Sequence, residues 1–197
     1  MENLNVFTDD MLVARYQEGD DKAFDELLAR YQDKLYNYIL FNVRNQELAE
    51  DVFQETFVKA IVTIQQRRYT PDGRFGAWIT RIAHNLVIDS FRSDRNENTI
   101  SNDDTEVDLF NDADLCDDNI EMQMVNEQTL ADVRMLVDAL PDNQREVVYM
   151  RYYQDLSFKE IAEITGVSIN TALGRMRYAL LGMRRMAEEK DIVLEMY

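Results

Sequence analysis

The sequence predicts an all-α protein with two helical domains joined by an acidic, flexible linker, the second domain carrying a helix-turn-helix. Three observations predict this fold class. Helix-favouring residues are common, Pro occurs only twice, and no strand-like alternation is sustained. Apolar residues recur at helical spacing in several stretches. The formal net charge of −17 is uneven, because residues 97–131 contain acidic residues but no Lys or Arg.

These observations divide the chain into three parts. Residues 1–96 and 119–197 are expected to be helical domains, and residues 97–118 are expected to be the linker. The linker is rich in Asn and Asp and has no clear period, which is typical of a solvated segment. Most of the negative charge therefore belongs to the segment between the domains rather than to their surfaces.

The first domain is expected to begin with an amphipathic helix that Asp20 or Asp21 can cap. A second helix is predicted over NQELAEDVFQETFVKAIVTI, residues 45–64. Each has an apolar stripe at helical spacing. The stripes are Phe24, Leu27, Leu28, Tyr31, Leu35, Tyr38 and Ile39 in the first, and Ala49, Val52, Phe53, Thr56, Phe57, Ala60, Ile61 and Ile64 in the second.

The outward face of the second helix carries a possible binding surface. Asp51, Gln54, Glu55 and Val58 fall along one line of it. Two interpretations follow from the residues alone. The line is either a solvated helix surface, as most charged faces are, or a docking face for a basic partner.

A third helix is predicted after the loop PDGRFG, residues 71–76. Its inward residues are Ile79, Ile82, Ala83, Leu86 and Ser90, and its outward residues are Arg81, Asn85, Ile88, Arg92 and Arg95. Cationic and amide groups beside Phe75 and Trp78 suit single-stranded nucleic acid, since Arg pairs with phosphates and rings stack on unpaired bases. The alternative is that both aromatics are core anchors, and partial burial is expected of Trp78. His84 is expected at the surface or as a supporting hydrogen-bond donor.

The second domain contains the stretch LSFKEIAEITGVSINTALGRMRYALLGMRR, residues 156–185. Ser157 and Glu160 are spaced as a capping box, and Leu156 and Ile161 as a hydrophobic staple. Gly166 stands where a helix ends, and Ser168 can cap the next helix. Two helices joined by a tight turn, the second longer and basic, are typical of a helix-turn-helix, although an ordinary helical hairpin has the same pattern.

The composition also bounds the class of protein. There is no apolar run long enough to span a membrane, and MENLNVFTDD is not a secretory signal. The single cysteine, Cys116, cannot form an internal disulfide, and no Cys/His cluster suits zinc. A reducing cytoplasm is the expected location. A single His and the lack of a Gly-rich phosphate loop argue against an enzyme, and no cofactor is expected.

Three motifs, in order, resemble those of an extracytoplasmic-function (ECF) sigma factor, the small two-domain class of bacterial sigma factors. AEDVFQETFVKA resembles the helix that binds the polymerase clamp. FGAWITRIAHNLVIDSFR resembles the helix that melts the promoter and reads the −10 element. LPDNQREVVYMRYYQDLSFKEIAEITGVSINTALGRMRYAL resembles the helix-turn-helix domain that reads the −35 element.

The resemblance implies specific residues for each partner. It places Asp51, Gln54, Glu55 and Phe57 in the motif that docks on core polymerase. Helical periodicity turns Phe57 inward and puts Val58 on the exposed line, so docking is expected of Asp51, Gln54, Glu55 and Val58 and packing of Phe57. The resemblance assigns −10 DNA binding to Phe75, Trp78, Arg81, Asn85, Asp89 and Arg92. It assigns −35 DNA binding to Ser168, Thr171, Leu173, Gly174, Arg175, Arg177 and Tyr178.

One position departs from the family pattern. Many relatives carry a basic residue and then a small hydroxyl where this chain has Leu173 and Gly174. Leu173 offers only apolar contact, for example with a thymine methyl group.

The resemblance further implies an anti-sigma factor as a partner, no direct membrane insertion and no enzymatic activity. The alternative function is a stand-alone helix-turn-helix transcriptional regulator that acts without polymerase docking.

Overall fold

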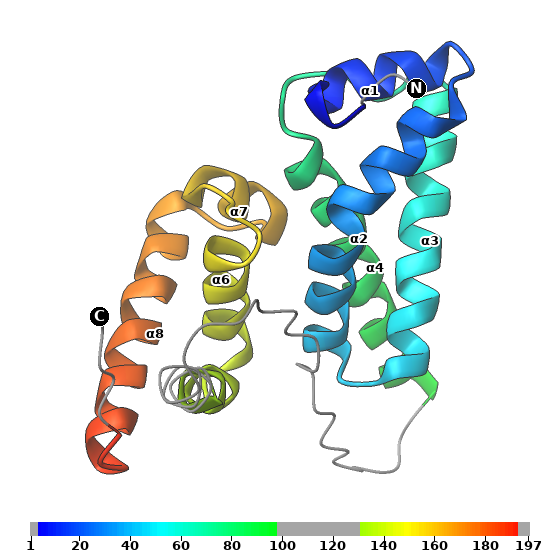
Figure 1. The fold of residues 1–197 in the computed structure, drawn as a ribbon. Coiled ribbons are helices and arrows are strands. Elements are labelled where there is room, and N and C mark those ends of the chain that lie inside the picture. The colour runs from blue at the N-terminus through cyan, green and yellow to red at the C-terminus, as the bar shows by residue number, and fades with distance from the viewer. Residues whose placement is uncertain (1–3, 98–130, 193–197) are drawn as a thin grey trace, which may run out of the picture. The chain divides into compact units, whose positions relative to one another are not determined.

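The computed structural model describes residues 4–97 and 131–192, with side chains of residues 93–97 outside the description (Figure 1). All regular secondary structure in these ranges is helical, as predicted. The chain divides into two compact units, Met1–Leu109 and Phe110–Tyr197, called unit 1 and unit 2 below. The predicted linker, apart from the helical residue 97, lies outside the described residues.

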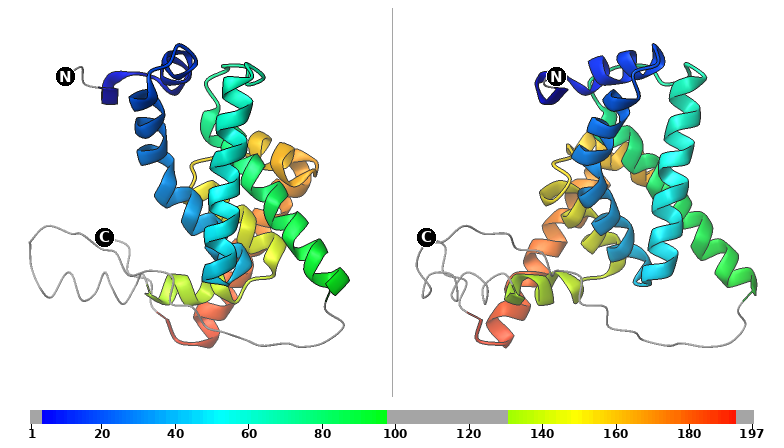
Figure 2. Two further views of the ribbon diagram at one scale, coloured as in Figure 1. Left: turned by 90° about the vertical axis from the view of Figure 1, so that its right-hand side faces the viewer. Right: turned by 45° about the vertical axis from the view of Figure 1, so that its right-hand side comes forward.

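Unit 1 is built around three long helices. These are α2 (Asp21–Val43), α3 (Gln46–Gln65) and α4 (Phe75–Glu97), and each packs against the other two (Figures 1 and 2). The apolar stripes predicted for α2 and α3 face this core. Phe53 and Ile61 on α3, and Leu28 and Tyr31 on α2, are only half-buried. Edge-on ring contacts, such as Phe24 with Phe57, fill the space between α2 and α3.

A short N-terminal helix, α1 (Asp9–Gln17), completes unit 1 and follows a 3₁₀ turn, η1 (Leu4–Val6). The Thr8 hydroxyl caps α1 by accepting from the Met11 N–H. Leu12 and Val13 of α1 are fully buried. The chain then turns at Gly19, whose φ is 98°, and α2 begins after Asp20, which occupies the cap position without a side-chain capping bond. The sequence analysis did not predict α1.

Unit 2 has the predicted helix-turn-helix. Its described part comprises a helical segment at residues 131–138, then α6 (Asp142–Tyr152), α7 (Phe158–Thr165) and α8 (Ile169–Glu189). The capping box is present, with the Ser157 N–H donating to Glu160 at 2.8 Å and the Glu160 N–H donating to the Ser157 hydroxyl at 3.3 Å. Gly166 ends α7 with a φ of 67°. The turn predicted from local sequence is therefore confirmed.

Candidate functional site

The outer face of α3 is a continuous exposed surface. Asp51, Gln54, Glu55 and Val58 are all exposed and are spaced i, i+3, i+4 and i+7, so that they follow one line along the helix. Glu55 forms an exposed ion pair with Lys59 at 2.9 Å. Phe57 points the other way and is buried, in agreement with its predicted packing role. This line presents two carboxylates, an amide and an isopropyl group to solvent.

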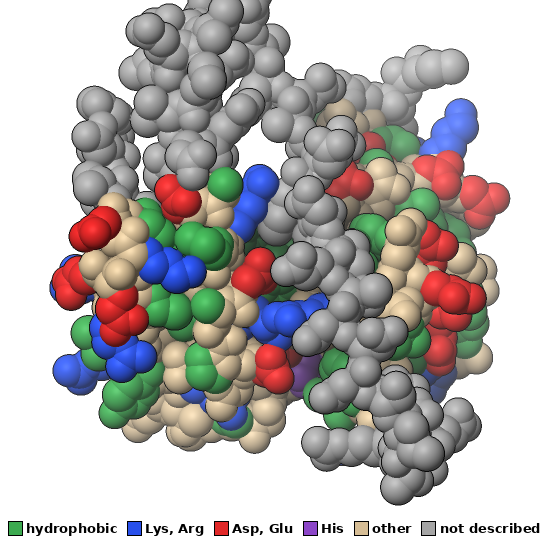
Figure 3. Space-filling view, turned by 90° about the horizontal axis from the view of Figure 1, so that it is seen from below, with side chains coloured by type: hydrophobic (Ala, Val, Ile, Leu, Met, Phe, Trp, Pro, Cys, Tyr) green, Lys and Arg blue, Asp and Glu red, His purple; other side chains and the backbone are tan. Residues whose placement is uncertain are grey.

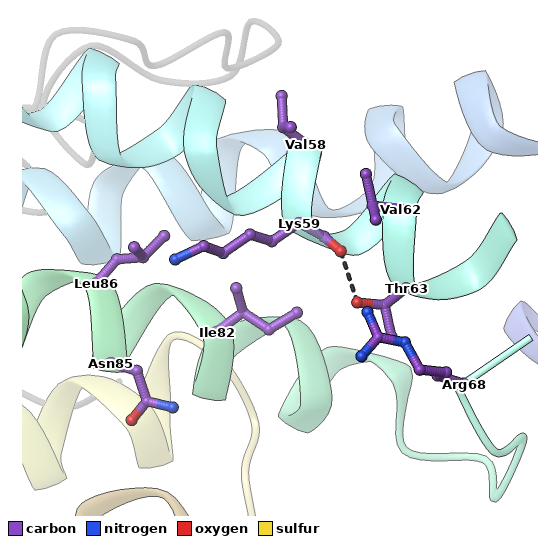
Figure 4. Close-up of a pocket in the computed structure, with 8 residues that line it drawn as sticks. All are labelled: Val58, Lys59, Val62, Thr63, Arg68, Ile82, Asn85 and Leu86. Atoms are coloured by element: carbon purple, nitrogen blue, oxygen red, sulfur yellow. Dashed lines mark hydrogen bonds between the residues drawn. The ribbon is translucent and has the colours of Figure 1, made fainter. Parts of the chain in front are cut away.

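A groove of about 410 Å³ lies between α3 and α4 (Figure 4). Its wall on α3 includes Val58, and its wall on α4 includes Asn85. The remaining lining residues are Lys59, Val62, Thr63, Arg68, Ile82 and Leu86. Val58 was predicted to contact polymerase and Asn85 to contact the −10 strand, so the two predicted surfaces meet at this groove.

The outward face of α4 groups most of the predicted −10 residues. Arg81, Asn85, Asp89 and Arg92 are exposed and lie within one narrow sector of the helix, because their spacings are i, i+4, i+8 and i+11. Arg92 pairs with Asp89 at 3.4 Å, so this part of the face carries compensated charge. Arg95, also predicted to face outward, has no described side chain.

An aromatic cluster supports the start of α4. Tyr69, Phe75 and Trp78 form it, with ring centroids 4.6 Å apart for Tyr69 and Trp78, and 5.5 Å apart for Phe75 and Trp78. Trp78 is half-buried, as expected from the sequence. Phe75 differs from its predicted role, because its side chain has no exposed surface at all. It can support Trp78 but cannot stack on a base in this conformation.

Of the two roles expected for His84, the structure agrees with a supporting hydrogen-bonding group and not with a surface position. His84 is buried against α2, where its Nδ1 lies 3.1 Å from the Tyr38 hydroxyl. Helical periodicity did not reveal this position because α4 is covered by α2 and α3 over a wider arc than a single apolar stripe. Its role is a polar contact between helices inside the core.

Two adjacent acidic residues of α1 connect this helix to α2 and to the loop before α4. Neither residue was predicted from the sequence to have a role. Asp9 accepts hydrogen bonds from Arg30 at 2.9 Å and from the Tyr31 hydroxyl. Asp10 accepts from the Gly73 N–H at 2.9 Å and from the Tyr69 hydroxyl at 3.4 Å. Burial and the nearby carboxylates raise the pKa of both tyrosines, so each hydroxyl stays a donor at neutral pH.

The predicted −35 residues occupy two flanks of α8. Thr171, Gly174, Arg175 and Tyr178 share one flank, as their spacing requires. Leu173 and Arg177 lie on the other, where they line a groove of about 330 Å³. Ser168 caps α8, accepting from the Thr171 N–H at 3.0 Å. The other residues that line the groove are Phe158, Met176, Leu180, Leu181 and Arg184.

The described surface is of mixed charge. On the face seen in Figure 3, Lys and Arg side chains are interspersed with acidic and hydrophobic ones. Residues 1–96 have a net charge of −4 and residues 132–197 a net charge of −2. Neither unit has the net positive charge that drives strong non-specific binding to DNA. No helix in the described ranges has both the length and the apolar character to cross a membrane.

Comparison with known proteins places both units in one family. Residues 27–97 match the Sigma-70 region 2 model, and residues 130–177 match the Sigma-70 region 4 model. The ECF RNA polymerase sigma-E factor of Haemophilus influenzae is 31% identical over 188 residues, covering 93% of this chain and 95% of that protein. The ECF RNA polymerase sigma factor BldN of Streptomyces coelicolor is 35% identical over 156 residues, and the match spans 79% of this chain and 56% of that protein.

The fold agrees with that of solved sigma factors. The structure of CnrH in complex with the cytosolic domain of CnrY has a TM-score of 0.62 at 24% identity, covering 92% of this chain and 97% of that one. The sigma factor RpoE of Bartonella quintana, in complex with the anti-sigma factor NepR, has a TM-score of 0.61 at 20% identity, with coverages of 85% and 98%.

The two matched regions thus define a transcription initiation factor of the sigma class. The chain belongs to the ECF sigma factors, which bind core RNA polymerase and direct promoter-specific initiation. A stand-alone helix-turn-helix regulator, the alternative function, is not favoured.

Proposed function

We propose that the α3 face docks on core polymerase, the α4 face captures the unpaired −10 strand and α8 reads the −35 duplex, with no chemistry catalysed by the chain itself. One observation is the main support for this proposal. The two exposed faces of unit 1 fall within the residues that match region 2, and the exposed N-terminal half of α8 falls almost wholly within those that match region 4.

The chemistry of the α3 face suits a basic partner with an apolar element. Asp51 and Glu55 can form charge-assisted hydrogen bonds with Arg or Lys. Val58 is 57% exposed and continues into the apolar wall of the groove between α3 and α4. A partner helix that carries cations and one or two apolar side chains would satisfy both features.

The α4 face has the groups that single-stranded DNA requires. Arg81 can pair with a phosphate, Asn85 can hydrogen-bond a base edge, and the exposed part of Trp78 can stack on an unpaired base. Such contacts would offset an unstacking free energy of a few kcal/mol for each extruded base. The burial of Phe75 leaves Trp78 as the aromatic contact.

The two flanks of α8 suit the two sides of a major groove. Thr171, Arg175 and Tyr178 offer hydrogen-bond donors on one flank. Leu173 offers apolar contact on the other, next to Arg177, which can reach a phosphate. Because the units are acidic overall, polymerase would have to supply much of the affinity for promoter DNA. Polymerase and DNA as partners also support a cytoplasmic location.

We further propose that an anti-sigma factor holds the chain inactive by covering the α3 face. Val58 and Val62 together leave an apolar surface on unit 1 that polymerase would cover in the active complex. A partner that covered the same surface would exclude polymerase.

Co-elution with core polymerase tests the docking face. The variant Asp51→Lys with Glu55→Lys is expected to lose most of its affinity for core polymerase, while its helical circular dichroism and melting temperature stay nearly constant, because surface substitutions change stability by about 0.5 kcal/mol or less. The matched control is Asp25→Lys with Asp33→Lys, two exposed acidic residues on α2. An unchanged affinity for the α3 variant, or an equal loss for the α2 control, would refute the assignment.

A further inference from the structure

The loop between α3 and α4, residues 66–74, is held at two points by one carboxylate from a distant part of the chain. Asp10 of α1 accepts a hydrogen bond from the Gly73 N–H at 2.9 Å and another from the Tyr69 hydroxyl at 3.4 Å. Tyr69 stands near the middle of this loop and Gly73 near its end. Asp10 lies outside residues 27–97, which match the region 2 model.

The first of these bonds fixes the backbone of the loop. Gly73 has a φ of 73°, a left-handed conformation that glycine adopts without steric cost. Its neighbour Arg74 accepts the Trp78 N–H at 3.0 Å through its carbonyl, and this bond starts the first turn of α4. The Asp10 carboxylate therefore binds the backbone two residues before α4 begins at Phe75.

The second bond fixes the ring beneath Trp78. Tyr69 is buried, and its ring centroid lies 4.6 Å from that of Trp78. A ring held at its hydroxyl cannot slide along its neighbour without breaking that bond. At 3.4 Å this bond is longer than the roughly 2.5–3.0 Å usual for a hydroxyl donor, so it restrains the ring more weakly than the 2.9 Å bond to Gly73 restrains the backbone. Asp10 thus constrains Trp78 in two ways, through the loop backbone at Gly73 that leads into α4 and through the Tyr69 ring that packs against Trp78.

We infer that Asp10 is a positioning residue for the promoter-strand face of α4: it holds Tyr69 and Gly73 so that Trp78 is preset to stack on an unpaired base. This inference rests on the proposed role of α4 in −10 strand capture. It makes α1 a determinant of promoter opening rather than of polymerase docking, because the Asp51–Val58 line of α3 has no contact with the bonds that Asp10 makes.

The neighbouring residue provides a matched control. Asp9 belongs to the same first turn of α1 and is equally half-buried, but it bonds Arg30 and Tyr31 of α2 and not the loop. A general loosening of α1 should therefore follow from Asp9→Asn as well as from the matched substitution Asp10→Asn. An effect on Trp78 and on DNA that is specific to Asp10 separates positioning from stability.

The first measurement uses the free full-length chain. Trp78 is its single tryptophan, so its fluorescence and its quenching by acrylamide report this site alone. Asp10→Ala is expected to shift the emission and raise the quenching constant, Asp10→Asn to give an intermediate change because its amide oxygen still accepts a bond, and Asp9→Asn to leave the signal close to wild type. An unchanged Trp78 signal in Asp10→Ala would overturn the inference.

The second measurement uses holoenzyme assembled from core polymerase and each variant. A promoter is first selected with the wild-type holoenzyme from random duplex DNA, and its single-stranded −10 oligonucleotide is then the probe. Asp10→Ala is expected to bind this probe about tenfold more weakly, the equivalent of one lost charge-assisted hydrogen bond, with unchanged affinity for core polymerase. Asp9→Asn is expected to retain wild-type binding to the probe.

Two control variants separate failure of this inference from failure of the proposed function. If Asn85→Ala and Trp78→Ala weaken probe binding but Asp10→Ala does not, Asp10 has only a structural role and the inference is overturned. If neither Asn85→Ala nor Trp78→Ala weakens it, the role of α4 in strand capture is itself wrong, and the positioning role falls with it.

Discussion

Asn85 is the residue that best separates promoter opening from base reading. It is exposed on the α4 face and also lines the groove next to α3. Asn85→Ala is expected to reduce open-complex formation on a duplex promoter. If Asn85 helps to open the DNA, a template with a pre-opened bubble should be affected less. If it reads a base in the open strand, both templates should lose equally, and open-complex formation on the two templates is the measurement.

One outcome would contradict both of these roles of Asn85. If neither template changes, Asn85 does not contact the strand. Asp33→Ala, at an exposed acidic position on α2, is a suitable control for the assay. It is expected to leave open-complex formation unchanged on both templates.

Arg175 is expected to be a specificity residue of the −35 contact. It is half-buried on the flank of α8 that carries Thr171 and Tyr178. Arg175→Ala should reduce the discrimination between the selected −35 sequence and single-base variants by about 1–3 kcal/mol at one position. Competition binding of holoenzyme to these duplexes measures the change.

Arg185 is the matched arginine for that experiment. It is exposed near the end of α8 and pairs with Glu189 at 3.6 Å. Arg185→Ala should leave the discrimination unchanged. A uniform loss of affinity across all sequences in Arg175→Ala would mean that Arg175 contacts a phosphate and not a base.

For single residues, helical periodicity predicts which positions are exposed on a helix but not every position that is buried. The outward positions of α3 and α4 follow from helical periodicity alone, so Asp51 and Asn85 were placed correctly as exposed residues. The periodicity did not reveal that Phe75 is fully buried, because the ring is covered by Tyr31 and Tyr69, which come from other parts of the chain. His84 is buried for the same kind of reason, through Tyr38 of α2.

At the scale of elements, the helix boundaries that depend on local signals could be predicted from the sequence. The contacts between residues far apart in the chain could not. The capping box of α7 involves residues three positions apart, and it forms as predicted. Helix α1 has its own local signal, a Thr8 cap followed by two acidic residues. That signal was missed because α1 is short and its two buried residues make no recurring stripe. Its importance comes from bonds to Gly73, 63 residues away, which no local pattern contains.

Substitution by alanine is expected to have opposite effects on stability at two helical glycines, Gly76 of α4 and Gly182 of α8. A Cβ at Gly76 would lie 3.0 Å from Cε1 of Tyr31, a ring fixed by its bond to Asp9. Gly76→Ala is therefore expected to destabilise unit 1 by up to about 2 kcal/mol, since an overpacking cost of about 1–3 kcal/mol is set against a gain of about 1 kcal/mol in helix propensity. Urea unfolding followed by Trp78 fluorescence measures this change.

Gly182 of α8 is the matched site for that experiment. A Cβ there would lie 3.5 Å from Cδ2 of Leu140, an ordinary contact. Gly182→Ala should stabilise unit 2 by up to about 1 kcal/mol through helix propensity. Urea unfolding followed by far-ultraviolet circular dichroism measures it. Stabilisation by both substitutions would show that Tyr31 yields easily and that the contact at Gly76 is not a constraint.

For the whole molecule, the distribution of charge explains how an acidic chain can bind DNA. Residues 1–96 and 132–197, which carry the exposed faces assigned to polymerase and promoter, are nearly neutral, and residues 97–131 carry most of the negative charge. The order of parts along the chain could be predicted from composition.

Proteases that differ in specificity test this division of the chain. Residues 96–133 contain no Lys or Arg, so trypsin has no site there, whereas a protease that cuts at acidic residues has many. Because residues 97–118 are rich in Asp and Asn and should form no fixed fold alone, an acid-specific protease is expected to cut first between about Asn98 and Asp118. Mass spectrometry should then find two resistant fragments, one with the helices of unit 1 and the other with the helices of unit 2. A bound anti-sigma factor should slow the cutting. If the acidic segment of the free protein resists this protease as long as the helices do, it is folded or covered in the free chain, and the units are not joined by a flexible linker.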